Sequence, residues 1–365
     1  MKKILFSLAV LALVAACGQD TVTVKGTVAD GAQFPENTLV YLLDGTNVLD
    51  SAAVVNGAFT LKAPANLEKY YTVCADYRNR SPRDRSWMYG LIPEKGTCDL
   101  TFGETPDACT IDGSALNKAY SDFNEKIREY SNEYREKVGA LADDAEEEAE
   151  SIYNDLMEKV KGVSLEAIEK NANNFIAKTA LQNIIYDLNL DELKGIVAKC
   201  GKFIGEDEGI SRIVRCKEAE VATAEGKPFV DFEGKTPEGN PIKLSDIVGK
   251  GKWVLADFWA SWCGPCMGEI PNIKKTHEAL AGDKFTVLGV AVWDGDNSKS
   301  LDRMAEKEMT WPQIFVGEDK GPTDSYGIVG IPTMILFAPD GTIFKRGEEL
   351  RGAKMMETVR DIISQ

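Results

Sequence analysis

Two cysteines separated by two residues, Cys263 and Cys266, constrain the fold of this chain more than any other feature. Residues 253–259 before the pair are apolar and β-prone, and residues 267–280 after it have the pattern of a helix. The pair therefore lies where a strand leads into the N-terminus of a helix. N–H groups at such an end stabilise a negative sulfur and lower a cysteine pKa from about 8.5 towards about 7. We predict that Cys263 is a nucleophile and that the two thiols close and reopen a disulfide.

The surroundings of the pair carry a family resemblance from about residue 226 to residue 365. The matching stretches are residues 257–266 (DFWASWCGPC), then Glu269 and Pro271, and finally residues 330–333 (GIPT). On these residues the chain resembles the thioredoxin superfamily. Within it, the chain is similar to the TlpA/ResA-like envelope thiol-disulfide oxidoreductases, which are also classed as AhpC/TSA-like lipoproteins.

This resemblance implies a thioredoxin fold and thiol-disulfide exchange. Cys263 would attack a substrate disulfide and Cys266 would resolve the mixed disulfide that forms. In the family, the proline that corresponds to Pro332 follows a cis peptide bond and lies against the disulfide, and the residue that corresponds to Ile331 offers its backbone to a substrate strand. The substrate-binding residues are then those that flank the sulfurs: Trp262, Gly264, Pro265 and Ile331.

Two carboxylates are candidates to take the proton from Cys266 during resolution. Asp257, six residues before Cys263, matches the buried aspartate of thioredoxin. Glu269, three residues after Cys266 on the same helix face, matches the glutamate of the ResA-like pattern. A lone carboxylate on a central strand is costly and is hard to explain without a function. Glu269 is equally consistent with an ordinary exposed helix residue, and the division of work between the two acids stays open.

Other functions remain as alternatives. A zinc site needs two more Cys or His ligands, and the chain has one histidine, His277, and no second Cys-X-X-Cys pair. A thiol peroxidase is the stronger alternative, but peroxiredoxins keep Thr or Ser where this chain has Ala260. The third alternative is an assembly or binding lipoprotein, against which the intact cysteine pair and Pro332 argue. We expect no metal and no cofactor.

The dipeptide between the cysteines, Gly264-Pro265, is that of thioredoxin, whose potential is about −270 mV. The site also lacks the histidine that helps to make DsbA-type sites oxidising. We therefore expect a reductase of disulfides in envelope proteins, supplied with electrons by a membrane thiol donor.

The first 17 residues have the features of a targeting segment. Lys2 and Lys3 precede an apolar stretch at residues 4–14, and residues 14–17 (VAAC) resemble a bacterial lipobox. About eleven apolar residues are too few to span a bilayer. We expect cleavage before Cys17, lipidation of Cys17, and a protein anchored to a membrane of the cell envelope and facing the periplasm.

Charge and cysteine content limit the function further. Loss of Lys2 and Lys3 changes the net charge from −16 to −18 (−16 − 2), which disfavours nucleic-acid binding. Five cysteines remain besides those assigned to lipid and to chemistry: Cys74, Cys98, Cys109, Cys200 and Cys216. In an oxidising compartment the first pairs to consider are Cys98 with Cys109 and Cys200 with Cys216. Buried, unpaired thiols are an equally good interpretation.

The pattern along the chain predicts three domains after the signal peptide (1–17). Residues 18–113 alternate like short strands and include an Asn56-Gly57 hairpin signal, so we expect a β-sandwich-like domain. This stretch also resembles the uncharacterised β-domain found before AhpC/TSA lipoprotein domains. Residues 114–225 have helical periodicity and predict a helical linker, which is also a candidate homodimer surface. Residues 226–365 have the α/β element order of the thioredoxin fold.

Overall fold

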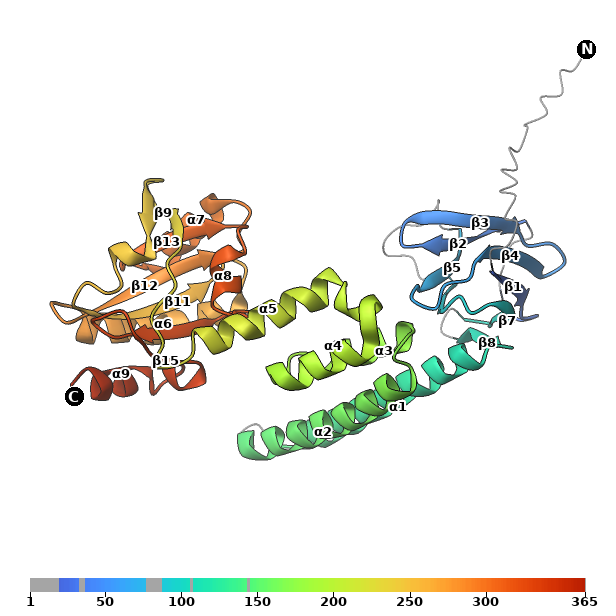
Figure 1. Cartoon of the computed structure of the whole chain (residues 1–365), viewed down its shortest axis with the longest axis horizontal. Helices are drawn as coiled ribbons and strands as arrows, with labels where there is room; N and C mark the ends of the chain where they lie inside the picture. Colours follow the sequence, from blue (N-terminus) through green and yellow to red (C-terminus); the bar gives the residue numbers. More distant parts are fainter. Residues whose placement is uncertain (1–19, 33–36, 77–86, 106–107, 143–144, 365) are drawn as a thin grey trace, which may run out of the picture. The chain divides into compact units, whose positions relative to one another are not determined.

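The computed structural model describes residues 20–32, 37–76, 87–105, 108–142 and 145–364. The chain divides into two compact units. The first contains residues Met1–Asp187 and Ile196–Ile204, and the second contains Leu188–Gly195 and Gly205–Gln365. Figure 1 shows the elements of both units.

The first unit begins with two four-stranded sheets, of orders β4-β1-β7-β8 and β3-β2-β5-β6. Side chains alternate along each strand, so that each sheet has one apolar face. Val24 and Leu61 of one sheet and Leu42 and Val73 of the other lie in one core, and all four are completely buried. The predicted β-sandwich-like domain is therefore confirmed. Its strands are β1 (Thr21–Val28), β2 (Leu39–Asp44), β3 (Asn47–Ala53), β4 (Ala58–Pro64), β5 (Tyr71–Ala75), β6 (Met88–Leu91), β7 (Gly96–Phe102) and β8 (Thr110–Asp112).

The turn at Asn56-Gly57 forms, but it does not join two strands of one sheet. Both residues have positive φ, 51° and 71°, as a tight two-residue turn requires. Val55 and Ala58 exchange two backbone hydrogen bonds across it, of 2.9 and 3.1 Å. Strand β3 before the turn and β4 after it belong to different sheets. The turn therefore carries the chain from one layer of the sandwich to the other.

The middle of the chain is helical, as predicted. Its helices are α1 (Ala115–Gly139), α2 (Glu146–Lys170), α3 (Phe175–Ile184), α4 (Leu190–Gly205) and α5 (Glu208–Ala222). The aromatic side chains of Tyr120 in α1 and Phe175 in α3 pack against Tyr70, with ring centroids 5.6 and 4.9 Å from the Tyr70 ring. Helix α4 contains a break, because Gly201 has φ 65° and ψ −152°.

The second unit contains the thioredoxin fold. Its seven-stranded sheet has the order β10-β9-β13-β12-β11-β14-β15. Strands β11, β12 and β13 are parallel, and β14 and β15 are antiparallel to their neighbours. The elements are β9 (Glu233–Lys235), β10 (Pro241–Lys243), η3 (Leu244–Asp246), β11 (Trp253–Trp259), α6 (Gly264–Leu280), β12 (Phe285–Val292), α7 (Asn297–Lys307), β13 (Gln313–Gly317), α8 (Gly321–Ser325), β14 (Thr333–Phe337), β15 (Ile343–Arg346), η4 (Glu348–Leu350) and α9 (Met355–Ile363). The sequence predicted this order but not the short helix α8.

Strand β11 lies at the centre of this sheet, and its side chains divide between two cores. Ala256 and Phe258 lie in the core that also contains Tyr326. Leu255 and Trp259 lie in the core that contains residues of α6 and α9 and both cysteines of the Cys-X-X-Cys pair. Because side chains alternate along a strand, Asp257 faces the second of these cores. The aspartate and the cysteines are therefore on the same side of the sheet.

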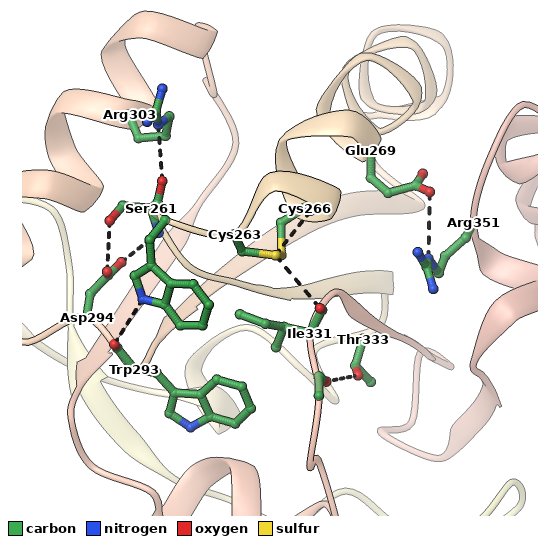
Figure 2. Close-up of a disulfide and its surroundings, with 12 residues drawn as sticks. Ser261, Cys263, Cys266, Glu269, Trp293, Asp294, Arg303, Ile331, Thr333 and Arg351 are labelled. Atoms are coloured by element: carbon green, nitrogen blue, oxygen red, sulfur yellow. Dashed lines mark hydrogen bonds and ion pairs between the residues drawn. A yellow bond between two sulfur atoms is a disulfide. The ribbon is translucent and has the colours of Figure 1, made fainter. Parts of the chain in front are cut away.

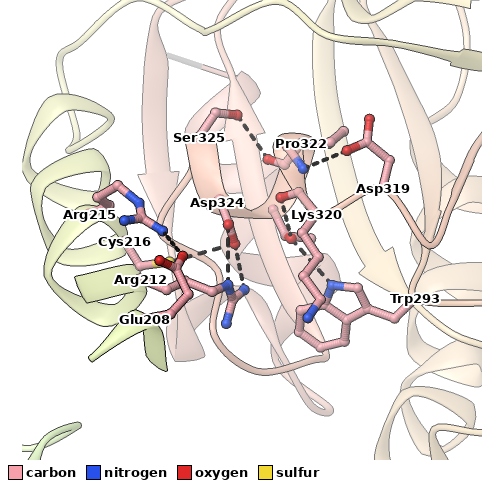
Figure 3. A network of polar contacts seen from close by, with 12 residues as sticks. Glu208, Arg212, Arg215, Cys216, Trp293, Asp319, Lys320, Pro322, Asp324 and Ser325 are labelled. Carbon is pink, nitrogen blue, oxygen red and sulfur yellow. Dashed lines mark hydrogen bonds and ion pairs between the residues drawn. The ribbon is translucent and has the colours of Figure 1, made fainter. Parts of the chain in front are cut away.

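Helix α5 belongs to the same unit as the thioredoxin fold. Arg212 of α5 forms an ion pair with Asp324 of α8, with 3.2 Å between Nε and Oδ2, and Figure 3 shows this contact. After the helix, Arg346 of β15 donates hydrogen bonds to the backbone oxygen and the hydroxyl of Thr223, at 3.1 and 3.0 Å. These contacts attach α5 to the elements that follow it. The domain boundary at residue 225 stays a prediction.

Candidate active site

The two cysteines form a disulfide at the first turn of α6. Cys263 is the N-cap residue, with extended backbone angles, and its Sγ accepts the backbone N–H of Cys266 at 3.1 Å. Pro265 occupies the first turn, where a missing N–H leaves no hydrogen bond unmade. A free N–H of a helix end thus points at the sulfur of Cys263, which is the geometry that stabilises a thiolate.

The surface around the disulfide is uneven. Trp262 before the first cysteine has 63% of its surface exposed, and Gly264 and Pro265 are also exposed. Cys263 is 4% exposed, whereas Cys266 is completely buried. A substrate sulfur therefore has access to Cys263 only.

A second segment reaches the disulfide from the loop before β14. The peptide bond between Ile331 and Pro332 is cis. The carbonyl oxygen of Ile331 lies 3.8 Å from Sγ of Cys263, as Figure 2 shows. Thr333 donates a hydrogen bond from its hydroxyl to the carbonyl of Gly330 at 2.8 Å, which closes the loop on itself. The backbone of Ile331 is thus placed beside the reactive sulfur.

The loop that carries Trp262 is held by a buried carboxylate that the sequence analysis missed. Asp294 is 3% exposed and accepts hydrogen bonds from the backbone N–H and the hydroxyl of Ser261, both at 2.8 Å. The hydroxyl of Ser300 donates a third, at 2.6 Å. Asp294 follows β12, the parallel neighbour of β11, and the carboxyl ends of neighbouring parallel strands meet at one edge of a sheet. An acid directly after such a strand was the available signal.

The exposed indole of Trp262 is also held from this edge. Its Nε1 donates a hydrogen bond to the carbonyl oxygen of Trp293 at 3.3 Å. Trp293 has φ 58°, a left-handed conformation that costs a non-glycine residue about 1 kcal/mol or more. The unusual backbone at Trp293 therefore accompanies the positioning of a side chain next to the disulfide.

Asp257 is a completely buried carboxyl group. Neither of its oxygens has a hydrogen-bond partner among the residues that the structure describes. The pKa of this carboxyl is raised from 3.8 to about 7: burial is the main cause, the negative charge of Glu269 adds to it, and the positive charge of Arg351 opposes both. A group with a pKa near 7 can both accept and return a proton at neutral pH.

Glu269 on α6 has defined partners. The backbone N–H of Gly352 donates to its Oε2 at 3.0 Å, and the side-chain amide of Asn272 donates to the same oxygen at 3.2 Å. The guanidinium Nε of Arg351 lies 3.6 Å from Oε1. The Glu269 side chain is 12% exposed, so its interpretation as an ordinary exposed helix residue is wrong.

Known proteins with similar sequences show which family the chain belongs to. The model of the AhpC/TSA family matches residues 226–346, and the model of a domain of unknown function, DUF4369, matches residues 22–120. Thioredoxin-like protein YneN of Bacillus subtilis is 34% identical over 126 residues, which cover 34% of this chain and 71% of that protein. The chain belongs to the thioredoxin-like AhpC/TSA family.

Other relatives are thiol-disulfide oxidoreductases. ResA of Geobacillus thermodenitrificans is 30% identical over 125 residues, which cover 34% of this chain and 69% of that protein. On these sequence relatives, this AhpC/TSA family member is a thioredoxin-like protein-disulfide oxidoreductase. The solved thioredoxin domain of a thiol-disulfide oxidoreductase from Bacteroides vulgatus is 34% identical, with 38% of this chain and 98% of that one covered and a TM-score of 0.36.

The other cysteines of the oxidoreductase do not form the disulfides Cys98–Cys109 and Cys200–Cys216. Cys98, Cys200 and Cys216 are buried thiols, and none of them is in a disulfide with another described residue. Burial raises the pKa of each thiol, to about 11 for Cys98, which disfavours the reactive thiolate. Both proposed disulfides are therefore wrong, and the alternative of buried thiols holds for these three cysteines. Cys17 and the rest of the predicted signal peptide lie outside the described residues.

The described residues contain no helix that is both long enough and apolar enough to cross a membrane. Within the same ranges, no three His, Cys, Asp or Glu side chains come together as the ligands of a metal ion would.

Asp257 makes the stability of the oxidised protein depend on pH. The folded state binds the carboxyl proton more tightly than the unfolded state, so the free energy of unfolding falls as pH rises from about 4 to about 7 and is level above that. Asp257→Asn removes this titration. The gain in stability of the variant over the wild type should be larger at pH 8 than at pH 3.5, by on the order of 4 kcal/mol.

Denaturant titrations of both proteins across this pH range measure the difference. Asp283→Asn, in the exposed turn between α6 and β12, is the matched control and should follow the wild-type curve. A difference between Asp257→Asn and the wild type that does not change with pH would contradict the assignment of a raised pKa to Asp257.

Proposed function

We propose that this oxidoreductase is a membrane-anchored reductase of disulfides in envelope proteins and that it acts through Cys263 and Cys266. One observation supports this most. The sulfur that substrate can reach, on Cys263, accepts a helix N-terminal N–H and lies beside the carbonyl of Ile331, while its partner Cys266 is buried on the side of the sheet that Asp257 faces. Attack and resolution are thus assigned to different sulfurs with different surroundings.

The reaction begins with the reduced protein. The Cys263 thiolate attacks one sulfur of the substrate disulfide, the substrate S–S bond breaks, and a mixed disulfide and a substrate thiolate form. Cys266 then gives its proton to Asp257, directly or through water, and attacks Sγ of Cys263. The second substrate thiolate leaves, and the protein retains the Cys263–Cys266 disulfide. Two electrons have passed from the protein to the substrate.

The substrate segment binds on the exposed side of the disulfide. Trp262 supplies an exposed indole, Gly264 and Pro265 leave the sulfur accessible, and the backbone of Ile331 is available for a hydrogen bond with an extended peptide. Pro332 lacks a backbone N–H, so the polar backbone groups offered at this position are those of Ile331. A disulfide-containing protein partner fits such a surface.

The reducing direction rests on what surrounds Cys263. A reduced site is favoured, and the protein becomes more oxidising, when many groups stabilise its thiolate. Here one backbone N–H reaches the sulfur, and the dipeptide Gly264-Pro265 contains no histidine. A thiol peroxidase is disfavoured because the completely buried Ala260 supplies no hydroxyl at the position where peroxiredoxins have one.

The anchored location rests on the sequence alone. The lipobox-like residues 14–17 place a lipid on Cys17, which holds the protein to a membrane of the envelope, facing the periplasm. A reductase in an oxidising compartment needs a continuous supply of electrons. A membrane thiol protein that carries electrons from the cytoplasm fits this need, because the lipid keeps the two proteins in the same membrane.

The two cysteines should differ in reactivity. At pH 7, Cys263 of the reduced protein should react with iodoacetamide about tenfold faster than Cys266 or more, because a helix-end N–H stabilises the Cys263 thiolate and Cys266 is completely buried. Peptide mass spectrometry after timed quenching measures both rates in the full chain. Equal rates at the two positions would reverse the assignment of roles.

The mixed disulfide should accumulate when resolution is blocked. Cys266→Ser should form a stable mixed disulfide with a disulfide-containing test protein such as insulin, because Cys263 still attacks and nothing releases the substrate. Non-reducing gels detect the adduct. Cys263→Ser is the matched control and should form none, and an adduct of equal yield in both variants would refute the mechanism.

The redox potential tests the direction. Equilibration with glutathione or dithiothreitol buffers should give a value near that of thioredoxin, about −270 mV. Pro265→His, which places an imidazole between the cysteines, should be more oxidising. A wild-type value above about −180 mV would make disulfide formation or shuffling the better function. Peroxide consumption with thiol recycling, without reduction of insulin, would favour the peroxidase.

Lipid anchoring is tested at Cys17. Cys17→Ser should abolish incorporation of labelled palmitate in cells and move the protein out of the membrane fraction or leave it unprocessed. Cys109→Ser, which removes a different thiol, is the control and should keep the label. Unchanged labelling of Cys17→Ser would contradict the lipoprotein proposal.

A further inference from the structure

We propose that Arg351, with the backbone N–H of Gly352, is a positioning device for disulfide exchange: it fixes the carboxylate of Glu269, and the opposite charges of Arg351 and Glu269 together set how readily Asp257 exchanges a proton with Cys266. This inference rests on the proposed function and deepens it. It assigns different roles to the two acids, which the sequence leaves open, and it adds a residue that no motif in the sequence indicated.

The position of Arg351 is fixed by the segment around it. The short helix η4 ends at Leu350, which is completely buried in the core that also contains Cys266 and Met355. Arg351 follows this anchor directly, and its side chain is 25% exposed. Its Nη1 lies 2.6 Å from a carboxylate oxygen of Glu348, a side chain that is 84% exposed. The guanidinium thus forms ion pairs with both the exposed Glu348 and the largely buried Glu269. The right side of Figure 2 shows the pair with Glu269.

Glu269 is held on both of its oxygens. Oε1 faces the guanidinium of Arg351 at 3.6 Å, and Oε2 accepts the backbone N–H of Gly352 at 3.0 Å. Asp257, in contrast, accepts no hydrogen bond in the described part of the chain. Its pKa is raised to about 7, mainly by burial, so Asp257 can exchange a proton near neutral pH.

Three segments face Asp257, and two of them carry a charge. Helix α6 contributes the negative charge of Glu269 and the sulfur of Cys266, and the segment after η4 contributes the positive charge of Arg351. Strand β14 places the apolar Met334 opposite Asp257. Arg351 lowers the pKa of Asp257, against burial and Glu269. Without the guanidinium, the pKa of Asp257 is higher. A smaller fraction of Asp257 is then ionised at pH 7 and able to accept a proton.

The experiment is a single-turnover measurement of mixed-disulfide formation and of its resolution between pH 5 and pH 9. In the wild type, the resolution rate should rise with pH and level off above the pKa of Asp257. In Arg351→Gln this rise should move to higher pH by about one unit, which lowers the rate about tenfold at pH 6 and restores it at pH 9. The rate of initial attack by Cys263 should stay within about twofold of the wild type.

Matched variants separate positioning from a general loss of structure. Arg351→Lys keeps the positive charge and should keep the wild-type pH profile to within about half a unit. Glu348→Gln removes the other ion pair of Arg351 and should leave the profile unchanged. Glu269→Gln removes the negative charge, so the rise should move to lower pH, and adding Arg351→Gln to it should have a smaller effect than in the wild type.

The outcomes distinguish the two proposals. If wild-type protein forms no mixed disulfide with insulin, the proposed function fails. If the wild type is active and folded Arg351→Gln resolves with the wild-type pH profile, the role of Arg351 alone is refuted. If Arg351→Gln does not fold, the profiles of Arg351→Lys and Glu269→Gln decide: an unshifted profile in Glu269→Gln, or a shift in Arg351→Lys, overturns the inference.

Discussion

A carboxyl group buried in the centre of the sheet, on the side covered by the cysteine helix, determines how the rest of this site is arranged. Asp257 has no exposed surface and no hydrogen-bond partner among the described residues, an arrangement that destabilises its ionised form. In a purely structural position an apolar side chain would pack better. The sheet tolerates the acid because it can remain protonated near neutral pH. The same property makes it a proton acceptor when an ionised neighbour and a cation set its affinity for the proton.

Much of this arrangement follows from local sequence. An apolar strand, two cysteines and an amphipathic segment predict a strand, a turn and a helix N-terminus, and the structure has β11, Cys263 at the N-cap and α6 in that order. The alternation of β11 also decides which face each of its side chains occupies. The sequence therefore predicts that Asp257 is buried, since a residue at the centre of a doubly covered sheet has no route to solvent.

Other parts depend on contacts between residues far apart in the chain. Asp294 reaches Ser261 because β12 is the parallel neighbour of β11, and Arg351 reaches Glu269 because Leu350 is anchored in the core. Neither pairing has a fixed spacing that a sequence pattern could reveal. The same holds for Cys98 and Cys200: short separations along the chain suggested disulfides, but burial as thiols satisfies these small apolar side chains equally well.

The site has two sides with different functions. On the exposed side, Trp262 and the backbone of Ile331 surround Cys263, and changes there alter which substrates bind. On the enclosed side, Cys266 lies in the core that Asp257 faces, with Glu269 at its edge, and changes there alter proton transfer. The disulfide is the boundary, since one sulfur belongs to each side. A thiol-disulfide oxidoreductase built this way can acquire new protein substrates by changing loops around Trp262 and Ile331, while the charges that control resolution stay the same.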